Sequence, residues 1–435
     1  MTGYRDLARN RDFTVLWIGE TVSELGARMS AFVYPLVALA ISGSPGAAAL
    51  VQFAYFAGIV AALLPAGVLA DRLHRRRLLR GVSLAGLTLY AVLAATLALD
   101  VLGVAGLAAG ALAAGVLTGI YEPAQLSAVR SVVRTDQLST ALAQNQARGQ
   151  VASLLGAPLG GVLLGVSRWL PFAVDAATYL VSFTTLGRIR TDLSAPPRPA
   201  TDDGRGPVRS AVHEVVQGGR FVLGHRTLRV ISCWSALSNL VVNGLLFVVL
   251  LRMVDAGHSA AAIGLVMTAA GIAGLVGAAL APRVIARTPT GALTVAVAWT
   301  CALPLVPLVW WAHPGVVAAC LSTLVLLNPI GNAGIGAYRI ALTPDHLQGR
   351  VGATSAFLSW SVMPFAPVVG GGLLAAYGGT VATAALLGGC VVVALVVTLA
   401  PTVRSVPRPD VWTAQLDRAR RAERAVATGP VAPVS

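Results

Sequence analysis

Long apolar segments separated by short polar connectors are the dominant pattern of this chain. Many of the segments run for about 18 residues or more almost without charge, which is enough helix to cross roughly 30 Å of hydrocarbon. We therefore predict an all-α polytopic membrane protein with twelve transmembrane helices. The predicted spans lie near residues 13–40, 47–70, 81–99, 103–127, 144–166, 169–187, 228–251, 260–281, 291–311, 315–338, 353–377 and 379–400.

The connectors between these spans alternate in charge. One set is short and nearly uncharged. Its two arginines are Arg168 and Arg252, and Arg28 lies within the first span. All the other arginines are assigned to the opposite set or to the two tails. Because arginine in short loops marks the cytoplasmic side, we expect both termini in the cytoplasm, and the even number of spans agrees.

The two halves of the chain resemble each other, and a long connector joins them. The stretch "APLGGVLL" in the first half returns as "APVVGGGLL" in the second. The connector holds "SAPPRPATDDGRGP", typical of a flexible linker, and then "VRSAVHEVVQGGRFVL", which has helical spacing of apolar residues. A repeat of six plus six spans is typical of the two bundles of a secondary transporter. The predicted units are a six-helix bundle at 1–187, a linker with a surface helix at 188–227, a second six-helix bundle at 228–401 and a basic tail at 402–435.

Composition supports the membrane assignment and excludes several kinds of chemistry. The chain is 56% hydrophobic and 11% charged, with a mean hydropathy of +0.75. All 32 basic residues are arginine, so neither a P-loop ATPase nor Schiff-base chemistry is available without a lysine. The four cysteines are scattered without a CxxC pair, and no histidine falls at mid-membrane. We expect no metal, no cofactor and no enzyme activity. The first apolar run carries charges and precedes no small-residue cleavage pattern, so no removable signal peptide is expected.

The densest charge lies in "GVLADRLHRRRLL", residues 67–79. Arginines at the cytoplasmic end of a span fix topology and hold anionic headgroups, at ~1 kcal/mol each. That explanation does not cover Asp71, because anionic lipid repels a carboxylate. Asp71 needs hydrogen-bond donors, either from the N-terminus of a neighbouring helix or from arginines.

Four stretches together resemble a known family: "RNRDFTVLWIGETVSELG", "LADRLHRRRLL", "DQLSTALAQNQARGQVASLLGAPLGG" and "PFAVDAATYLVS". They are similar to the major facilitator superfamily, and in detail to its drug-efflux members of the macrolide- and enterobactin-exporter kind. The resemblance implies alternating access around a cavity between helices one, four, seven and ten. It also implies a cytoplasmic gate in which the aspartate of the loop motif docks on the start of helix eleven. The matching motif residues are Gly67, Asp71, Arg72, Arg75 and Arg76. One departure is that helix four has no buried arginine of the kind that many proton–drug antiporters carry.

The first span holds Glu20, Glu24 and Arg28, spaced four residues apart and therefore on one helix face. A charge at the bilayer centre costs at least ~2.5 kcal/mol, so this face must look into protein or a water-filled cavity. One interpretation is an internal Glu24–Arg28 ion pair with a structural role. The other is a protonatable carboxylate that couples to cationic substrate or to proton flow.

Other intramembrane polar residues are further candidates. Asn239 and Asn243 on span seven, Asn328 and Asn332 on span ten, and Glu122 on span four fall on the helices expected around the cavity. The asparagines are equally explained as interhelical hydrogen-bonding residues. Asp175, on the peripheral span six, is expected to be a structural partner. Helix packing and bending are assigned to Gly156, Pro158, Gly160, Gly161, Pro367 and Gly370.

The sequence therefore predicts a plasma-membrane secondary transporter, a monomer, that exports small amphipathic or cationic organic compounds and is coupled to protons. Its expected partners are the small-molecule substrate, protons and membrane lipid, and not nucleic acid. Two alternatives stay open: an uptake permease for a nutrient or siderophore, and a membrane scaffold or sensor that transports nothing.

Overall fold

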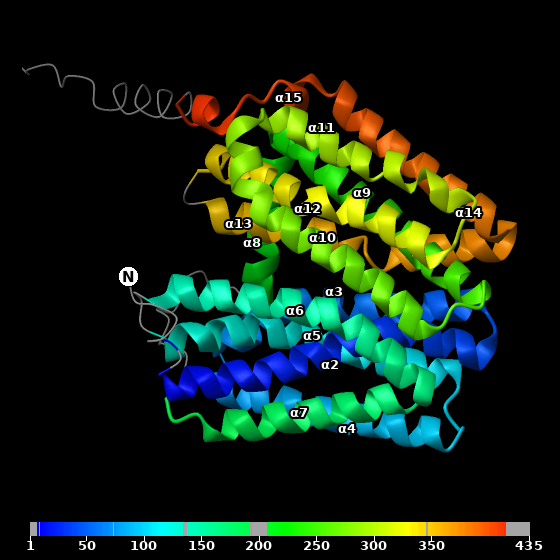
Figure 1. Cartoon of the computed structure of the whole chain (residues 1–435). Coiled ribbons are helices and arrows are strands. Elements are labelled where there is room, and N and C mark those ends of the chain that lie inside the picture. The colour runs from blue at the N-terminus through cyan, green and yellow to red at the C-terminus, as the bar shows by residue number, and fades with distance from the viewer. Residues whose placement is uncertain are drawn as a thin grey trace, which may run out of the picture.

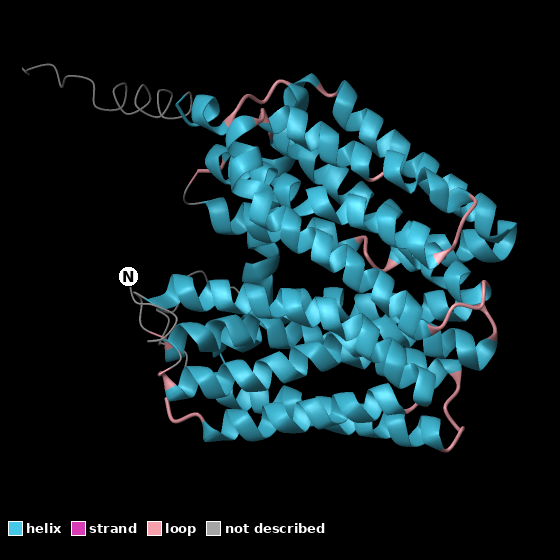
Figure 2. Cartoon of the chain, in the orientation of Figure 1, coloured by secondary structure: helices cyan, strands magenta, loops and turns pink. Residues whose placement is uncertain are grey.

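The computed structural model describes residues 7, 9–72, 74–133, 137–191, 193, 207–344 and 347–414. All regular secondary structure in these residues is helical (Figure 2), and the helices form two lobes (Figure 1). The first lobe contains α2 (Arg11–Ser42), α3 (Pro45–Arg72), α4 (Arg75–Ala98), α5 (Val104–Val132), α6 (Leu138–Val166) and α7 (Leu170–Arg188).

The second lobe contains α9 (Arg226–Asp255), α10 (Ala260–Arg287), α11 (Thr290–Thr300), η2 (Leu303–Val309), α12 (Pro314–Leu342), α13 (Gln348–Ser361), α14 (Phe365–Leu399) and α15 (Pro401–Arg404). The helix expected in the connector is present as α8 (Pro207–Gly224), which packs against α13, α9 and α3. It lies between the two lobes in Figure 1.

Twelve membrane-crossing segments follow from these helices. Ten stretches of the described chain are long and apolar enough to span a membrane by composition alone. The stretch Arg350–Leu399 holds two of the predicted spans, because the backbone leaves the helical conformation at Gly378 (φ 77°). α7, with 19 residues, supplies the remaining span. The predicted twelve-helix fold in two bundles is therefore confirmed.

Several helices are longer than the apolar runs that predicted them. α4 begins at Arg75 and α6 at Leu138, six residues earlier in each case than the predicted spans. Backbone hydrogen bonding does not stop where the hydrocarbon does, and the arginines that begin α4 are good helix formers. One assignment must also be corrected. Arg148, which we grouped with the connector arginines, lies well inside α6 and is only 6% exposed.

The assignment of Arg252 is also corrected, because this residue lies in the last turn of α9 and not in a connector. Its guanidinium donates hydrogen bonds to the carbonyls of Leu308 (2.5 Å) and Val309 (3.3 Å) and to the Thr383 hydroxyl (2.8 Å). The carbonyls belong to η2, a 3₁₀ segment with internal prolines that replaces the second half of the predicted ninth helix. Leu308 and Val309 are the last residues of this segment, so no following turn supplies donors for their carbonyls, and the side chain of Arg252 supplies them instead.

Polar side chains tie the helices of the first lobe together where α3 ends and α4 begins, which we call the arginine-rich end. The amide of Asn10 caps α2 and also donates to the Val132 carbonyl (2.9 Å). Asp12 accepts both the backbone N–H (2.7 Å) and the hydroxyl (2.7 Å) of Thr191. The stretch "NRD" therefore joins the start of α2 to the ends of α5 and α7.

Two arginines of the predicted gate motif take part in the same network. Arg75 donates to the Ser131 hydroxyl (2.7 Å) and Arg76 to the Thr191 carbonyl (2.8 Å). The remaining motif residues are at the end of α3, and the side chains and packing of Gly67, Asp71 and Arg72 lie outside the described residues. The docking of Asp71 on helix eleven therefore stays a prediction.

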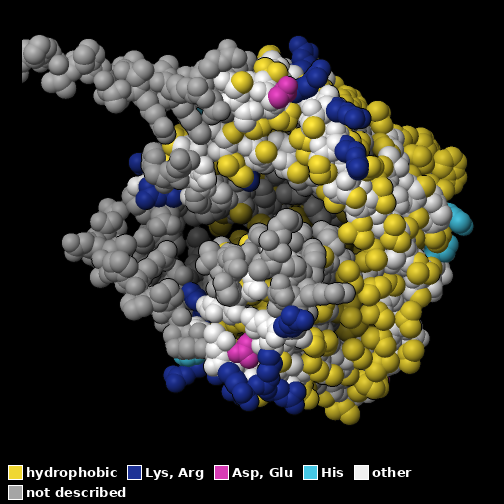
Figure 3. All heavy atoms as spheres, turned by 60° about the vertical axis from the view of Figure 1, so that its left-hand side comes forward, with side chains coloured by type: hydrophobic (Ala, Val, Ile, Leu, Met, Phe, Trp, Pro, Cys, Tyr) yellow, Lys and Arg dark blue, Asp and Glu magenta, His cyan; other side chains and the backbone are white. Residues whose placement is uncertain are grey.

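The two lobes contact each other closely at the opposite, arginine-poor end, through α6 against α10 and α3 against α14. Gly161 lies against the Ala260 carbonyl, with no room for a Cβ atom. The Thr268 hydroxyl donates to the Leu154 carbonyl of the other lobe (3.0 Å). Toward the arginine-rich end the lobes diverge (Figure 1), and Figure 3 shows a hollow between them on the face where the arginines gather.

Replacing Arg252 with methionine is expected to destabilise the second lobe. The substitution leaves three acceptors without their donor, at about 1–3 kcal/mol each if they stay buried. Thermal unfolding in detergent should show a midpoint several degrees below wild type. The control is Arg168→Met, whose ion pair with Asp100 is exposed (3.8 Å) and contributes less than about 1 kcal/mol. Equal midpoints for the two variants would contradict the role of Arg252.

Candidate functional site

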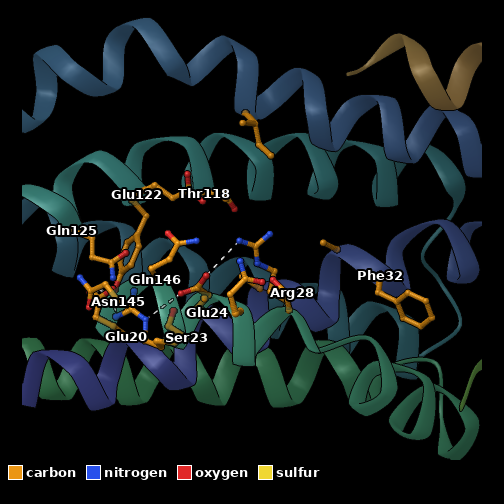
Figure 4. Close-up of a pocket in the computed structure, with 18 of the residues that line it drawn as sticks. Glu20, Ser23, Glu24, Arg28, Phe32, Thr118, Glu122, Gln125, Asn145 and Gln146 are labelled. Carbon is orange, nitrogen blue, oxygen red and sulfur yellow. Dashed lines mark hydrogen bonds and ion pairs between the residues drawn. The ribbon is translucent and has the colours of Figure 1, made fainter. Parts of the chain in front are cut away.

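A cavity of about 710 Å³ lies within the membrane-spanning region, and almost all of its wall comes from the first lobe. α2, α3, α5 and α6 supply most of the surface. Tyr179 of α7 and Trp360 of α13 complete it, and among the described residues Trp360 is the one lining residue from the second lobe. The lining is rich in carboxylates, guanidinium groups, side-chain amides and aromatic rings (Figure 4).

The charged residues of α2 point into this cavity, as their spacing predicts. Glu20 is 2% exposed and accepts a hydrogen bond from the Tyr121 hydroxyl (2.9 Å). Glu24 is bound on both of its oxygens: Arg28 contacts Oε1 (3.4 Å), and Arg148 Nε contacts Oε2 (3.2 Å). The expected Glu24–Arg28 pair is therefore present, as one contact of a larger cluster.

Arg148 is the residue that the sequence reasoning missed. It lies between the two glutamates, with Nη1 3.9 Å from Glu20 Oε2 and Nε 3.2 Å from Glu24 Oε2. It is a buried cation on α6, the fifth span. The signal was available, since Arg148 already falls inside the predicted span 144–166 in the amide-rich stretch "QNQARGQ". A guanidinium there costs free energy unless a carboxylate meets it.

Glu122 enters the cavity from α5, on the wall opposite the charges of α2 (Figure 4). Its side chain is exposed to the cavity and makes no hydrogen bond or ion pair with any described residue. It is close enough to Arg28 and Glu24 for an electrostatic interaction with both. The cavity therefore contains one carboxylate without a partner among the described side chains.

Glu20 is anchored through a chain of hydroxyl groups that leads away from the cavity. Tyr121, whose hydroxyl contacts Glu20, also shares a hydrogen bond with Ser182 (2.9 Å). Ser182 in turn contacts Ser83 (3.2 Å), which donates to a backbone carbonyl of its own helix. This chain links α2, α5, α7 and α4, and it fixes the position of the Glu20 carboxylate.

Asp175 is a second buried carboxylate and lies outside the cavity lining. It is 0% exposed and accepts hydrogen bonds from Ser30 of α2 (2.5 Å) and from Thr178 of its own helix (2.9 Å). Gly26 of α2 makes room for it, because a Cβ there would collide with the carboxylate. These contacts agree with the structural role expected for Asp175.

The asparagine pairs are not part of this cavity. Asn243 donates to the Asn239 backbone carbonyl (2.8 Å), and Asn332 donates to the Asn328 side chain (2.7 Å). None of the four lines the cavity, which differs from the expectation of helices one, four, seven and ten around it. Among the described residues, α9 and α12 contribute nothing to the lining of this cavity. Any role of these asparagines in transport stays a prediction.

The predicted packing residues of α6, the fifth span, contact two different neighbouring helices. Gly156 and Gly160 face α2, where added Cβ atoms would lie 2.6 Å from Arg28 Cβ and 3.0 Å from Val33 Cγ2. Pro158 and Gly161 face α10 in the other lobe, and α6 runs unbroken through Pro158. The equivalent residues of α14 lie in its first turns: Gly370 packs against α9, and Pro367 is buried.

Arg148→Met is expected to lower the thermal midpoint sharply, because breaking a buried ion pair on one side costs about 3–5 kcal/mol. Adding Glu20→Gln should restore part of the loss, since the double variant no longer buries an unpaired charge. Thermal unfolding of both single variants and the double variant measures this coupling. Strictly additive losses would mean that Arg148 and Glu20 do not stabilise each other.

Comparison with known proteins places this architecture in a family. A family model described as "Major Facilitator Superfamily" matches residues 16–363. None of the curated proteins searched matches the sequence. The structure is similar to that of a point mutant of the nucleoside transporter NupG, with a TM-score of 0.71, 12% identity, and coverage of 89% of this chain and 98% of that chain.

Two further solved structures show the same fold at similarly low identity. A D-xylose–proton symporter has a TM-score of 0.63 and 14% identity, covering 92% of this chain and 98% of its own. A bacterial homologue of the human lysosomal transporter Spinster, inward-facing and unoccupied, has a TM-score of 0.61 and 13% identity. The match covers 90% of this chain and 95% of that chain. Because the family model extends across most of the chain and both lobes match these folds, the chain belongs to the major facilitator superfamily.

Proposed function

We propose that this protein exports small amphipathic organic compounds by proton-coupled alternating access, as a drug- or metabolite-efflux member of its family. The observation that carries the proposal is the Glu20–Arg148–Glu24 cluster, which puts two carboxylates and one shared guanidinium in a membrane-embedded cavity. The likeness of "RNRDFTVLWIGETVSELG" and "PFAVDAATYLVS" to macrolide and enterobactin exporters supports the direction of transport.

The arginine-rich end is assigned to the cytoplasm and the membrane to the plasma membrane. The charge bias of the connectors supports this orientation, with both termini inside. The described shape is then a state open to the cytoplasm and closed outside, and the close contacts of Gly161 with Ala260 and of Gly264 with Pro158 support this assignment. Substrate enters from the cytoplasm, and rocking of the lobes exposes it to the exterior.

Proton coupling follows from the shared guanidinium. Arg148 forms ion pairs with both glutamates. When one glutamate is protonated, the guanidinium group of Arg148 therefore pairs with the other glutamate alone. A proton taken up from the exterior by Glu20 or Glu24 thereby rearranges the cluster, and substrate is released in exchange. Each elementary charge that moves inward contributes ~2.3 kcal/mol per 100 mV of membrane potential.

Uptake is the second candidate within transport, favoured by the similarity to the structure of a D-xylose–proton symporter. The two directions differ in the sign of substrate accumulation. A cell line that lacks other pumps should accumulate less substrate when it expresses an exporter and more when it expresses a permease. Equal accumulation with any substrate tested would favour the scaffold interpretation.

The double variant Glu20→Gln, Glu24→Gln is expected to abolish proton-driven export. Glutamine is close to glutamate in size but cannot exchange a proton at these pH values. Because the double variant also leaves Arg148 without a carboxylate, thermal unfolding of the same sample checks that the protein is folded. Transport in sealed vesicles with an imposed pH gradient measures the effect, and Asp100→Asn, at an exposed carboxylate outside the cavity, is the control. Undiminished transport by the double variant would reject the assignment.

Gly161→Leu is expected to shift the protein toward the state open to the exterior, because a side chain there collides with the Ala260 carbonyl. A single cysteine at cavity residue Gln52, in a background without the four native cysteines, reports access to an impermeant maleimide added outside. Labelling should be several-fold faster when the Gly161→Leu substitution is present. Gly165→Leu, one turn along the same helix with nothing within 4 Å, is the matched control. Equal rates in the two backgrounds would contradict closure at Gly161.

A further inference from the structure

We propose that the substrate of this cavity is zwitterionic, with an amine and a carboxylate or similar anion joined by an apolar body. This inference rests on the proposed function and narrows its substrate class. It comes from the difference between two sets of charges in the cavity: one set that the protein itself neutralises and one set that it leaves open.

The neutralised set lies deep in the wall. The side chain of Arg148 is 4% exposed and that of Glu20 is 2% exposed. Arg148 contacts Glu20 and one oxygen of Glu24, and the Tyr121 hydroxyl adds a hydrogen bond to Glu20. A ligand in the cavity gains little from Arg148 and Glu20, because both side chains are almost completely buried and their charges are paired within the protein.

The open set consists of Arg28 and Glu122. The Arg28 side chain is 49% exposed, and its one contact among the described residues is the 3.4 Å approach of Nη2 to Glu24. A guanidinium has five N–H donors in a planar fork that suits a carboxylate or phosphate, so most of this fork is free. Glu122 is exposed to the cavity and has no described partner.

These two charges interact without neutralising each other directly. Glu122 interacts electrostatically with Arg28, but no ion pair within 4.0 Å joins them among the described side chains. Along the cavity, Arg28 lies toward Phe32 and Glu122 lies toward Gln125 at the other end (Figure 4). A molecule between them meets the N–H donors of the Arg28 guanidinium at one end and the Glu122 carboxylate at the other.

Neutral polar residues and aromatic rings line the rest of the cavity. Gln52 and Asn145 are among the polar ones. An ammonium group supplies three donors, which suits the Glu122 carboxylate. The rings of Phe32, Tyr55 and Phe56 provide apolar surface for the body of the molecule.

A substrate with a single charge fits this arrangement less well. A simple cation at Glu122 is repelled by Arg28, and a simple anion at Arg28 is repelled by Glu122 and Glu24. The cavity holds three carboxylates and two guanidinium groups, so protonation of Glu20 or Glu24 makes it neutral overall while Glu122 keeps its charge. A zwitterion without net charge then binds a neutral site with both of its charges paired.

The test is a matched series of probes that bind the purified full-length protein in detergent. The probes are 4-(aminomethyl)benzoate as the zwitterion, its methyl ester as the cation, and 4-methylbenzoate as the anion. We expect the zwitterion to bind at least tenfold more tightly than either of the others in isothermal titration. Equal or tighter binding by the ester or the methylbenzoate would overturn the proposal, as would absence of zwitterion binding.

Two variants separate recognition from a loss of folding. Glu122→Gln should weaken zwitterion binding at least tenfold and shift preference toward 4-methylbenzoate, whereas Arg28→Met should shift it toward the methyl ester. Arg168→Met removes an arginine outside the cavity and should leave the ranking unchanged. An unchanged ranking in both cavity variants would overturn the proposal.

The binding experiment needs no gradient and no direction of transport, so its outcome is independent of proton coupling. Intact zwitterion preference together with normal transport by the Glu20→Gln, Glu24→Gln variant would overturn proton coupling alone. Proton-driven export of singly charged cations without zwitterion binding would overturn the zwitterion proposal alone.

Discussion

A charge inside hydrocarbon must find a partner in the protein, and this requirement organises the whole molecule. Water is not available there, so unpaired charges and backbone groups each cost kilocalories. Arg252 meets the requirement with the carbonyls of a broken helix, and Asp175 meets it with hydroxyl groups of two helices. Arg148 meets it with two glutamates. Each of these contacts fixes the relative position of helices that are distant in sequence.

The second organising feature is close approach of backbones. Lipid tails are as apolar as leucine, so helices in a membrane associate through packing and hydrogen bonds and not through the hydrophobic effect. Helix α6 shows how one sequence motif contributes to two interfaces. Gly156 and Gly160 pack against α2 within the first lobe, while Gly161 meets α10 of the second. The same short stretch therefore stabilises a rigid lobe and a contact that must open if the lobes rock.

The cavity combines these features at the first lobe. Its deep charges are paired and held by a hydroxyl chain, which keeps their geometry fixed. Its exposed charges, Arg28 and Glu122, lack that support and face the open space. In the two proposals above, the fixed cluster responds to protons and the open pair recognises substrate. The two proposals made here depend on different residues of one cavity.

The sequence by itself determined the twelve helices, the two bundles, the connector helix and the inward face of Glu20, Glu24 and Arg28. These follow from apolar length and helical period, which are local properties of the chain. Only the tertiary structure decided that Arg148 joins Glu20 to Glu24, that the asparagine pairs stay outside the cavity, and that Glu122 lacks a partner among the described side chains. Those facts depend on how far apart the lobes are and how the helices are rotated. Spacing along one helix fixes neither, because packing between helices is set by contacts such as Gly161 with Ala260.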